Sequence, residues 1–256
     1  MIANDNEYSY GVIVESNPGI QYGLFDSANA SENQNRKTAM IFDDVQARER
    51  MVQEQLVVRG IRDPRVLWAM ARVPRHLFVE NELWDHAYDD RPLPIGADQT
   101  ISQPYMVALT VEALELKGTE RVLEVGTGSG YAAAVLAELC AEVFSVEAVE
   151  ELALKARANL TSVGHTNVSV LAGDGTLGWE EHAPYDAVVI SAAAPCIPRP
   201  LLEQLRTPGY LVLPMGEKEL QTLVRIRKDR EGIREEYLAE CRFVKLTGRY
   251  GWEDIG

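Results

Sequence analysis

A glycine-rich turn followed by a separate acid is the pattern in this sequence with the clearest chemistry. The stretch from Leu123 to Tyr131 (LEVGTGSGY) predicts a buried strand that passes through a turn into a helix. Such a turn exposes backbone N–H groups at a helix N-terminus, where a ligand can lie against bare main chain. Glu147 ends the next apolar strand, and its carboxylate can accept two hydrogen bonds from a ribose diol. Turn and acid together predict a nucleoside cofactor on a doubly wound α/β sheet.

The spacing of the glycines distinguishes between classes of nucleoside cofactor. A dinucleotide-binding turn needs a glycine at the position of Tyr131, and a Walker loop needs a lysine that is absent here. The spacing Glu-x-Gly-x-Gly-x-Gly instead resembles that of S-adenosylmethionine-dependent methyltransferases. The residues expected to carry the cofactor here are Glu124, Gly126, Thr127, Gly128, Gly130 and Glu147. The alternative is a turn that only packs the helix against the strand.

Composition excludes several partners. The 256 residues carry a formal net charge of −14, which argues against binding a nucleic-acid phosphate backbone. Three widely spaced cysteines indicate reduced thiols in a cytoplasmic protein, and the four histidines lack metal-ligand spacing, so no metal is expected. No apolar stretch predicts a membrane span, and no secretory signal is expected at the N-terminus.

The pattern along the chain predicts an extension and one domain. Residues 1–40 are expected to be a variable extension, partly disordered or forming a small hairpin. Residues 41–99 are expected to be a helical region on the substrate side, in which Asp63 and Pro64 begin a helix, followed by an irregular proline-containing segment. Residues 100–256 are expected to be the cofactor-binding α/β core. Its strands are predicted at 121–125, 143–147, 168–172, 185–191, 209–213, 220–227 and 237–244, with helices at 104–114, 131–140, 149–163 and 199–206.

No helix is predicted between the last two strands, where the chain has only the short segment Lys228 to Gly232, and a parallel crossover needs more. The sheet is therefore expected to be mostly parallel, with an antiparallel hairpin at its end. This is the Rossmann-like form of the fold that suits a methyltransferase.

Two further segments are candidates for the site. Gly173-Asp174-Gly175 follows the third predicted core strand, at the edge where open α/β sheets bind ligands. Asp174 is expected to accept a hydrogen bond from an adenine amino group; the alternative is an ordinary turn aspartate. Ser102 has neither a neighbouring histidine nor a Gly-x-Ser-x-Gly elbow, so it is a poor hydrolase nucleophile. It can cap the helix at Pro104 and also touch a ligand.

The chain resembles the protein-L-isoaspartate O-methyltransferase family from about Arg50 to Val244. The segment that is most specific to the family is Thr100-Ile101-Ser102-Gln103-Pro104. The other matching segments are Arg59-Gly60-Ile61, Val73-Pro74-Arg75-His76, Ala87-Tyr88-Asp89-Asp90, Pro92–Gly96, Glu124–Tyr131, Gly173-Asp174-Gly175, Ala183–Asp186 and Ala192–Pro195.

The resemblance implies an enzyme that methylates the free α-carboxylate of isoaspartyl residues in aged proteins, acting as a monomer without nucleic-acid or membrane partners. It implies that Ser102 is the active-site serine, that Thr100 and Ile101 lie beside the cofactor with Gly175, and that Thr247 borders the pocket. Departures from the family pattern include Asp98 before Gln99 and Lys245 in place of a proline, both close to segments expected to bind substrate.

Three alternatives stay open. A related activity methylates an aspartate in a dedicated partner peptide. A small-molecule methyltransferase shares the same cofactor turn. A non-catalytic S-adenosylmethionine-binding protein would also keep that turn.

Overall fold

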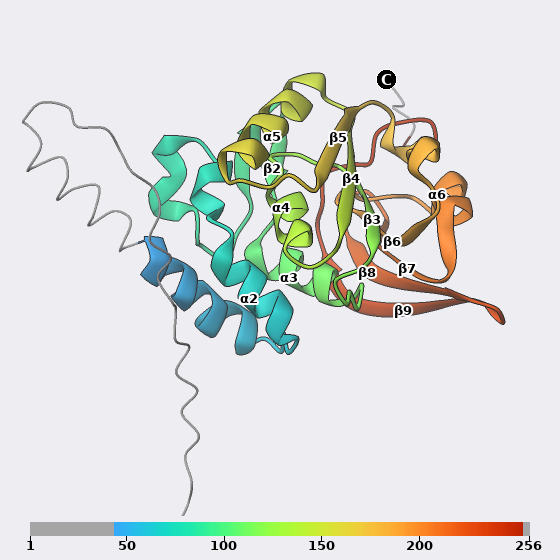
Figure 1. The fold of residues 1–256 in the computed structure, drawn as a ribbon, viewed down its shortest axis with the longest axis horizontal. Helices are drawn as coiled ribbons and strands as arrows, with labels where there is room; N and C mark the ends of the chain where they lie inside the picture. The colour runs from blue at the N-terminus through green and yellow to red at the C-terminus, as the bar shows by residue number, and fades with distance from the viewer. Residues whose placement is uncertain (1–43, 253–256) are drawn as a thin grey trace, which may run out of the picture. The chain divides into compact units, whose positions relative to one another are not determined.

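Seven strands form the main sheet in the part of the chain that the computed structural model describes, residues 44–252 (Figure 1). Their order across the sheet is β5-β4-β3-β6-β7-β8-β9. Neighbours from β5 to β7 are parallel, whereas β8 is antiparallel to both β7 and β9. The strands are β3 (Arg121–Val125), β4 (Glu142–Glu147), β5 (Val168–Ala172), β6 (Tyr185–Ile190), β7 (Leu205–Gly216), β8 (Gln221–Asp229) and β9 (Gly232–Cys241). The prediction of a mostly parallel seven-stranded sheet that ends in an antiparallel hairpin is confirmed.

Helices cover both faces of this sheet. The helices α3 (Pro104–Glu112), α4 (Tyr131–Ala137) and α5 (Glu150–Ser162) contribute to one apolar cluster, together with α2 (Pro64–Arg72). The helix α6 (Arg199–Gln204) belongs to the cluster on the opposite face, and Figure 1 shows α4 and α5 on one side of the strands and α6 on the other. Along β3, Val122 belongs to the first cluster, whereas Leu123 and Val125 belong to the second, as the two-residue period of a strand requires. The strands are thus apolar on both faces.

The region before the core is helical, as expected. Residues 44–50 form an α-helix that continues as a π-helical stretch, η1 (Met51–Val57). The predicted start of the next helix is confirmed, because Asp63 accepts a hydrogen bond from the Arg65 N–H at 2.8 Å and Pro64 occupies the first turn. The 3₁₀ helices η2 (Arg75–Phe78) and η3 (Asn81–His86) follow. The expected N-terminal hairpin lies outside the described residues.

The irregular segment predicted before the core contains a small sheet instead. Strands β1 (Leu93–Gly96) and β2 (Gln99–Ile101) pair antiparallel around Ala97 and Asp98. Both turn residues have positive φ, 49° and 56°. Aspartate tolerates this region, whereas alanine rarely adopts it. Since alanine is not a residue that predicts such a turn, the hairpin was not expected from the sequence.

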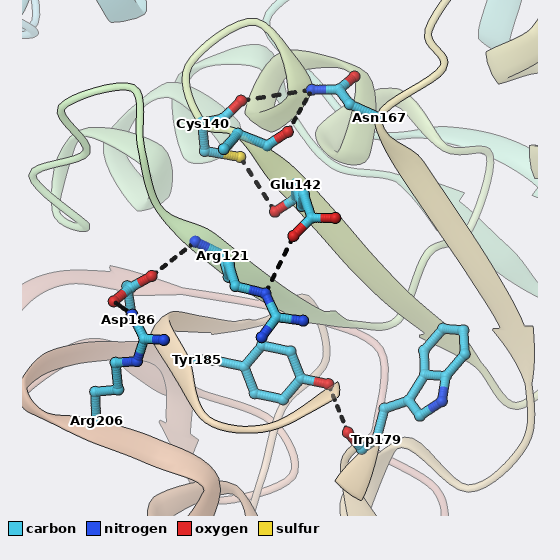
Figure 2. A network of polar contacts seen from close by, with 9 residues as sticks. Arg121, Cys140, Glu142, Asn167, Trp179, Tyr185, Asp186 and Arg206 are labelled. Carbon is cyan, nitrogen blue, oxygen red and sulfur yellow. Dashed lines mark hydrogen bonds and ion pairs between the residues drawn. The ribbon is translucent and has the colours of Figure 1, made fainter. Parts of the chain in front are cut away.

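A polar network fixes the amino ends of the central strands (Figure 2). Asp186 on β6 accepts a hydrogen bond from the Arg121 N–H at 2.8 Å and also pairs with Arg206. The Arg121 side chain reaches Glu142 on β4 at 3.1 Å. This end of β3 lies opposite the glycine turn, so the network supports the strands without entering the candidate site.

Two remaining 3₁₀ helices, η4 (Gly175–Leu177) and η5 (Glu180–His182), connect β5 to β6. Within residues 44–252 no helix is both long and apolar enough to cross a bilayer.

Candidate active site

A cavity opens at the carboxyl ends of the parallel strands. Four strand ends supply part of its wall, since residues after β3, β4, β5 and β6 all line it. The segment from Gln99 to Ser102, the helices α3 and α4 and residues 243–247 supply most of the rest. Because parallel strands all end at the same edge, residues far apart in the sequence meet there. The predicted residues that line this cavity are Thr100, Ile101, Ser102, Gly126, Thr127, Gly128, Glu147, Gly175 and Thr247.

The glycine turn lies directly over the end of β3. Gly126 has a φ of +90°, and its N–H donates to the Val146 carbonyl at 2.8 Å, which holds the turn against β4. Gly130 has a φ of +91° at the N-cap of α4, and a Cβ there would meet Leu160 at 3.3 Å. Gly130 is absent from the cavity wall, so its structural contribution is close packing of α4 on α5.

Glu147 closes the side of the cavity next to β4. One carboxylate oxygen accepts from the Gly128 N–H at 2.8 Å, and the other accepts from the Val149 N–H at 3.0 Å. Each carboxylate oxygen has two lone pairs, so both can accept one further hydrogen bond from a ligand. The side chain is 6% exposed, which fixes its direction toward the cavity that it lines. The arrangement suits a vicinal diol such as that of ribose.

Glu124 lies behind the turn and does not reach the cavity. Ser145 donates a hydrogen bond to Glu124, and Ser145 also bonds the Thr127 hydroxyl at 2.6 Å, which connects the acid to the turn. Glu124 is fully buried, and its second oxygen has no partner among the described residues. Burial raises the pKa of Glu124 from an ordinary 4.5 to about 8, against the lowering effect of the Ser145 hydrogen bond. The expected contact between Glu124 and the cofactor stays a prediction. In the structure Glu124 lies where it supports the glycine turn from behind.

Ser102 sits between β2 and α3 and lines the cavity half-buried. The N-cap of α3 is Gln103, and no side chain makes a capping bond there. The serine is therefore not needed to cap the helix, and its hydroxyl is available to a ligand. Pro104 occupies the first turn of α3, as predicted.

Asp174 is committed to other contacts. One carboxylate oxygen accepts from the Thr176 N–H at 2.9 Å and hydroxyl at 2.6 Å, and the other accepts from the Arg249 N–H at 2.8 Å. The side chain thus caps η4 and binds the segment after Thr247. Asp174 does not line the cavity, whereas Gly175 does. Its expected hydrogen bond to adenine stays a prediction.

Sequence reasoning overlooked part of the cavity wall. On α3 the residues Met106, Val107 and Thr110 line it, at the three- and four-residue spacing that places side chains on one face of a helix. That spacing was readable in the sequence directly after the Thr100–Pro104 motif. Ser191 and Ala192 also line it, after β6. Ala192 begins a segment that matches the family, but no pattern placed either residue at the cavity.

Comparison with known proteins agrees with this geometry. The family model for protein-L-isoaspartate(D-aspartate) O-methyltransferase matches residues 46–251. The protein-L-isoaspartate O-methyltransferase of Syntrophus aciditrophicus is 55% identical over 208 residues, which are 80% of this chain and 95% of the relative. The corresponding protein of Geobacter metallireducens is 55% identical over 207 residues, 80% of this chain and 96% of the relative.

Two solved structures are similar over most of the chain. One is described as a protein-L-isoaspartate O-methyltransferase, with a TM-score of 0.73 and 29% identity, covering 80% of this chain and 67% of that one. The other, from Plasmodium falciparum, is described as a putative protein-L-isoaspartate O-methyltransferase in complex with S-adenosyl-L-homocysteine. Its TM-score is 0.67 with 26% identity, covering 78% of this chain and 98% of that one.

Proposed function

The chain belongs to the protein-L-isoaspartate(D-aspartate) O-methyltransferase family, and we propose that it methylates the free α-carboxylate of isoaspartyl residues in damaged proteins and peptides. The methyl donor is S-adenosylmethionine. The observation that carries the proposal is one cavity that joins a glycine turn, a buried acid and an available serine hydroxyl. The glycine turn and the acid suit the methyl donor, and the serine hydroxyl suits an anionic acceptor.

The residues of the cavity fit the donor. Glu147 has spare lone pairs for the ribose, and the turn from Gly126 to Gly128 has little side-chain bulk to block its methionine portion. Gly175 allows a close approach of the backbone to β3, because a Cβ there would lie 2.5 Å from Val125 Cγ1. When bound, S-adenosylmethionine supplies a methyl group on positively charged sulfur, and its transfer to an anionic oxygen removes both charges.

The protein needs no general base for this reaction. A carboxylate acceptor is already ionised near pH 7, so the chain has only to bind it, orient it and exclude water. The Ser102 hydroxyl can donate a hydrogen bond that holds the carboxylate in place. Methylation of an isoaspartyl α-carboxylate makes it a better leaving group for attack by the backbone amide, which closes a succinimide without further help from the enzyme.

Labelled S-adenosylmethionine and two peptides that differ only in an aspartyl or isoaspartyl linkage test this function. We expect base-labile methyl ester on the isoaspartyl peptide alone. Equal labelling of both peptides would favour methylation of ordinary aspartate, and no labelling of either would contradict the proposed substrate.

Replacement of Ser102 by alanine tests the acceptor side. We expect kcat to fall about tenfold, because the hydroxyl orients the attacking carboxylate oxygen toward the methyl group and no proton has to move. The affinity for S-adenosylhomocysteine in calorimetry should change little. Ser169→Ala, at an exposed position on β5, is the matched control. An unchanged kcat for Ser102→Ala would show that the hydroxyl does not hold the acceptor.

The finer expectations about partners and location also belong to this proposal. A cytoplasmic monomer without nucleic-acid or membrane partners is supported by the formal charge of −14 and by three cysteines that are all free. We also propose that residues 41–99 lie on the substrate side of one methyltransferase domain. The place of Gln99, the last residue of that region, in the cavity wall supports that part of the proposal.

A further inference from the structure

The cavity wall contains two formally charged residues within the described part of the chain, Glu147 and Lys245. Glu147 is accounted for by the ribose of the donor. Lys245 has no place in the function derived so far. It stands in the segment after β9 that completes the cavity wall.

The backbone around Lys245 is fixed by the residues that follow β6. The Ala193 N–H donates to the Val244 carbonyl at 2.7 Å, and the Leu246 N–H donates to the Ala193 carbonyl at 2.8 Å. These bonds form an isolated parallel bridge between Ala193 and Lys245. Lys245 is thereby held beside the carboxyl end of β6, at the edge of the sheet that carries the cavity.

Side chains along the extended residues 243–247 alternate between two faces, and this alternation separates Lys245 from its apolar neighbours Val244 and Leu246. Val244 and Leu246 pack into the apolar cluster on the α6 face of the sheet, whereas Phe243 packs with the other cluster. In extended backbone, residues two apart share a face, so Lys245 lies on the face of Phe243 and Thr247. Lys245 is exposed and makes no ion pair within residues 44–252.

The order of the strands places the two charges on opposite sides of the glycine turn. The turn follows β3, Glu147 ends β4 on one side, and Lys245 is bridged to the residues after β6 on the other. Glu147, which suits the ribose of the donor, thus lies on one side of the turn. Lys245, whose positive charge suits an anionic acceptor, lies on the other. In a chain with a net charge of −14, such a cation gives the cavity local positive potential.

We propose that the Lys245 ammonium group binds the free carboxylate of the isoaspartyl acceptor and so serves as a positioning residue for substrate. This inference rests on the proposed function. Methyl transfer removes the charge of the carboxylate, so an ion pair with Lys245 is stronger before the transfer than during it. Lys245 therefore lowers KM and does not raise kcat, which is the opposite of the effect expected for Ser102.

Replacement of Lys245 by methionine removes the charge and keeps an unbranched side chain. With an isoaspartyl peptide that has blocked ends and no other charge, we expect KM to rise about three- to tenfold, the range of one exposed ion pair that becomes partly covered. The value of kcat should stay the same or rise. Salt should raise KM of the wild-type protein and have little effect on the variant. Lys245→Arg should restore KM, and Lys117→Met, on an exposed turn before β3, is the control for net charge.

A second peptide makes the assignment independent of catalysis. It carries a carboxamide in place of the free carboxylate, and its binding is measured by calorimetry in the presence of S-adenosylhomocysteine. We expect wild-type protein and Lys245→Met to bind the carboxamide equally, and only the carboxylate peptide to distinguish them. If Lys245→Met binds and methylates the carboxylate peptide as well as wild type, the role of Lys245 is wrong and the proposed function stands. If wild-type protein neither binds nor methylates that peptide, the proposed function itself fails.

Discussion

Glu147→Ala is expected to lower the affinity for S-adenosylhomocysteine about a hundredfold. The carboxylate can accept two hydrogen bonds from the ribose, and charge-assisted bonds of this kind contribute about 1.5 to 3 kcal/mol each. Loss of about 3 kcal/mol corresponds to roughly two orders of magnitude in Kd. Isothermal calorimetry measures this change directly.

Two further variants show whether that loss comes from the ligand contact. Glu147→Gln keeps one oxygen acceptor and should bind with intermediate affinity, whereas Glu151→Ala, an exposed acid in the first turn of α5, should bind as wild type does. The carboxylate also bonds the Gly128 and Val149 N–H groups, so the melting temperature of each ligand-free variant must be measured alongside. Wild-type affinity in Glu147→Ala would show that the ribose is bound elsewhere.

The second large effect is a loss of folding stability as the pH rises, caused by the carboxyl group of Glu124. Its pKa is raised by burial to about 8 in the folded protein, so below that pH the folded chain keeps a proton that the unfolded chain releases above 4.5. Where the folded state binds more protons, stability falls as pH rises. We expect this one group to remove about 3 kcal/mol of the free energy of unfolding between pH 5 and pH 8.

Glu124→Gln isolates that contribution. Glutamine is neutral at every pH and can still accept the hydrogen bond from Ser145, so the variant should gain stability over wild type as pH rises from 5 to 8. Urea unfolding at several pH values measures the difference, with the exposed Glu219→Gln as control. Parallel stability curves for wild type and Glu124→Gln would mean that Glu124 is ionised in the folded protein.

The parts of the fold that depend on local sequence were the predictable ones. Strand β3 begins and ends where predicted, at Arg121 and Val125, because an apolar run is bounded by a glycine turn. The final hairpin was predictable because the sequence has no helix between its two strands that could make a parallel crossover. The hairpin of β1 and β2 was not predictable, since Ala97 occupies a conformation that alanine rarely adopts.

The same distinction applies to the site. Glu147 and the glycine turn are near each other in the sequence, and neighbouring parallel strands bring them together at one edge. Lys245 reaches that edge only through its bridge to Ala193, and Asp174 is engaged by Arg249 from the same distant segment. Contacts of this kind depend on how the last residues of the chain fold back over the sheet, which no local pattern encodes.

A crystal structure of the protein with S-adenosylhomocysteine and an isoaspartyl peptide tests the central claim most directly. The account predicts both ribose hydroxyls on the Glu147 carboxylate, the homocysteine portion along residues 126–128, and the peptide carboxylate near Ser102 and Lys245. A nucleoside bound away from Glu147, or a peptide carboxylate outside this cavity, would contradict it.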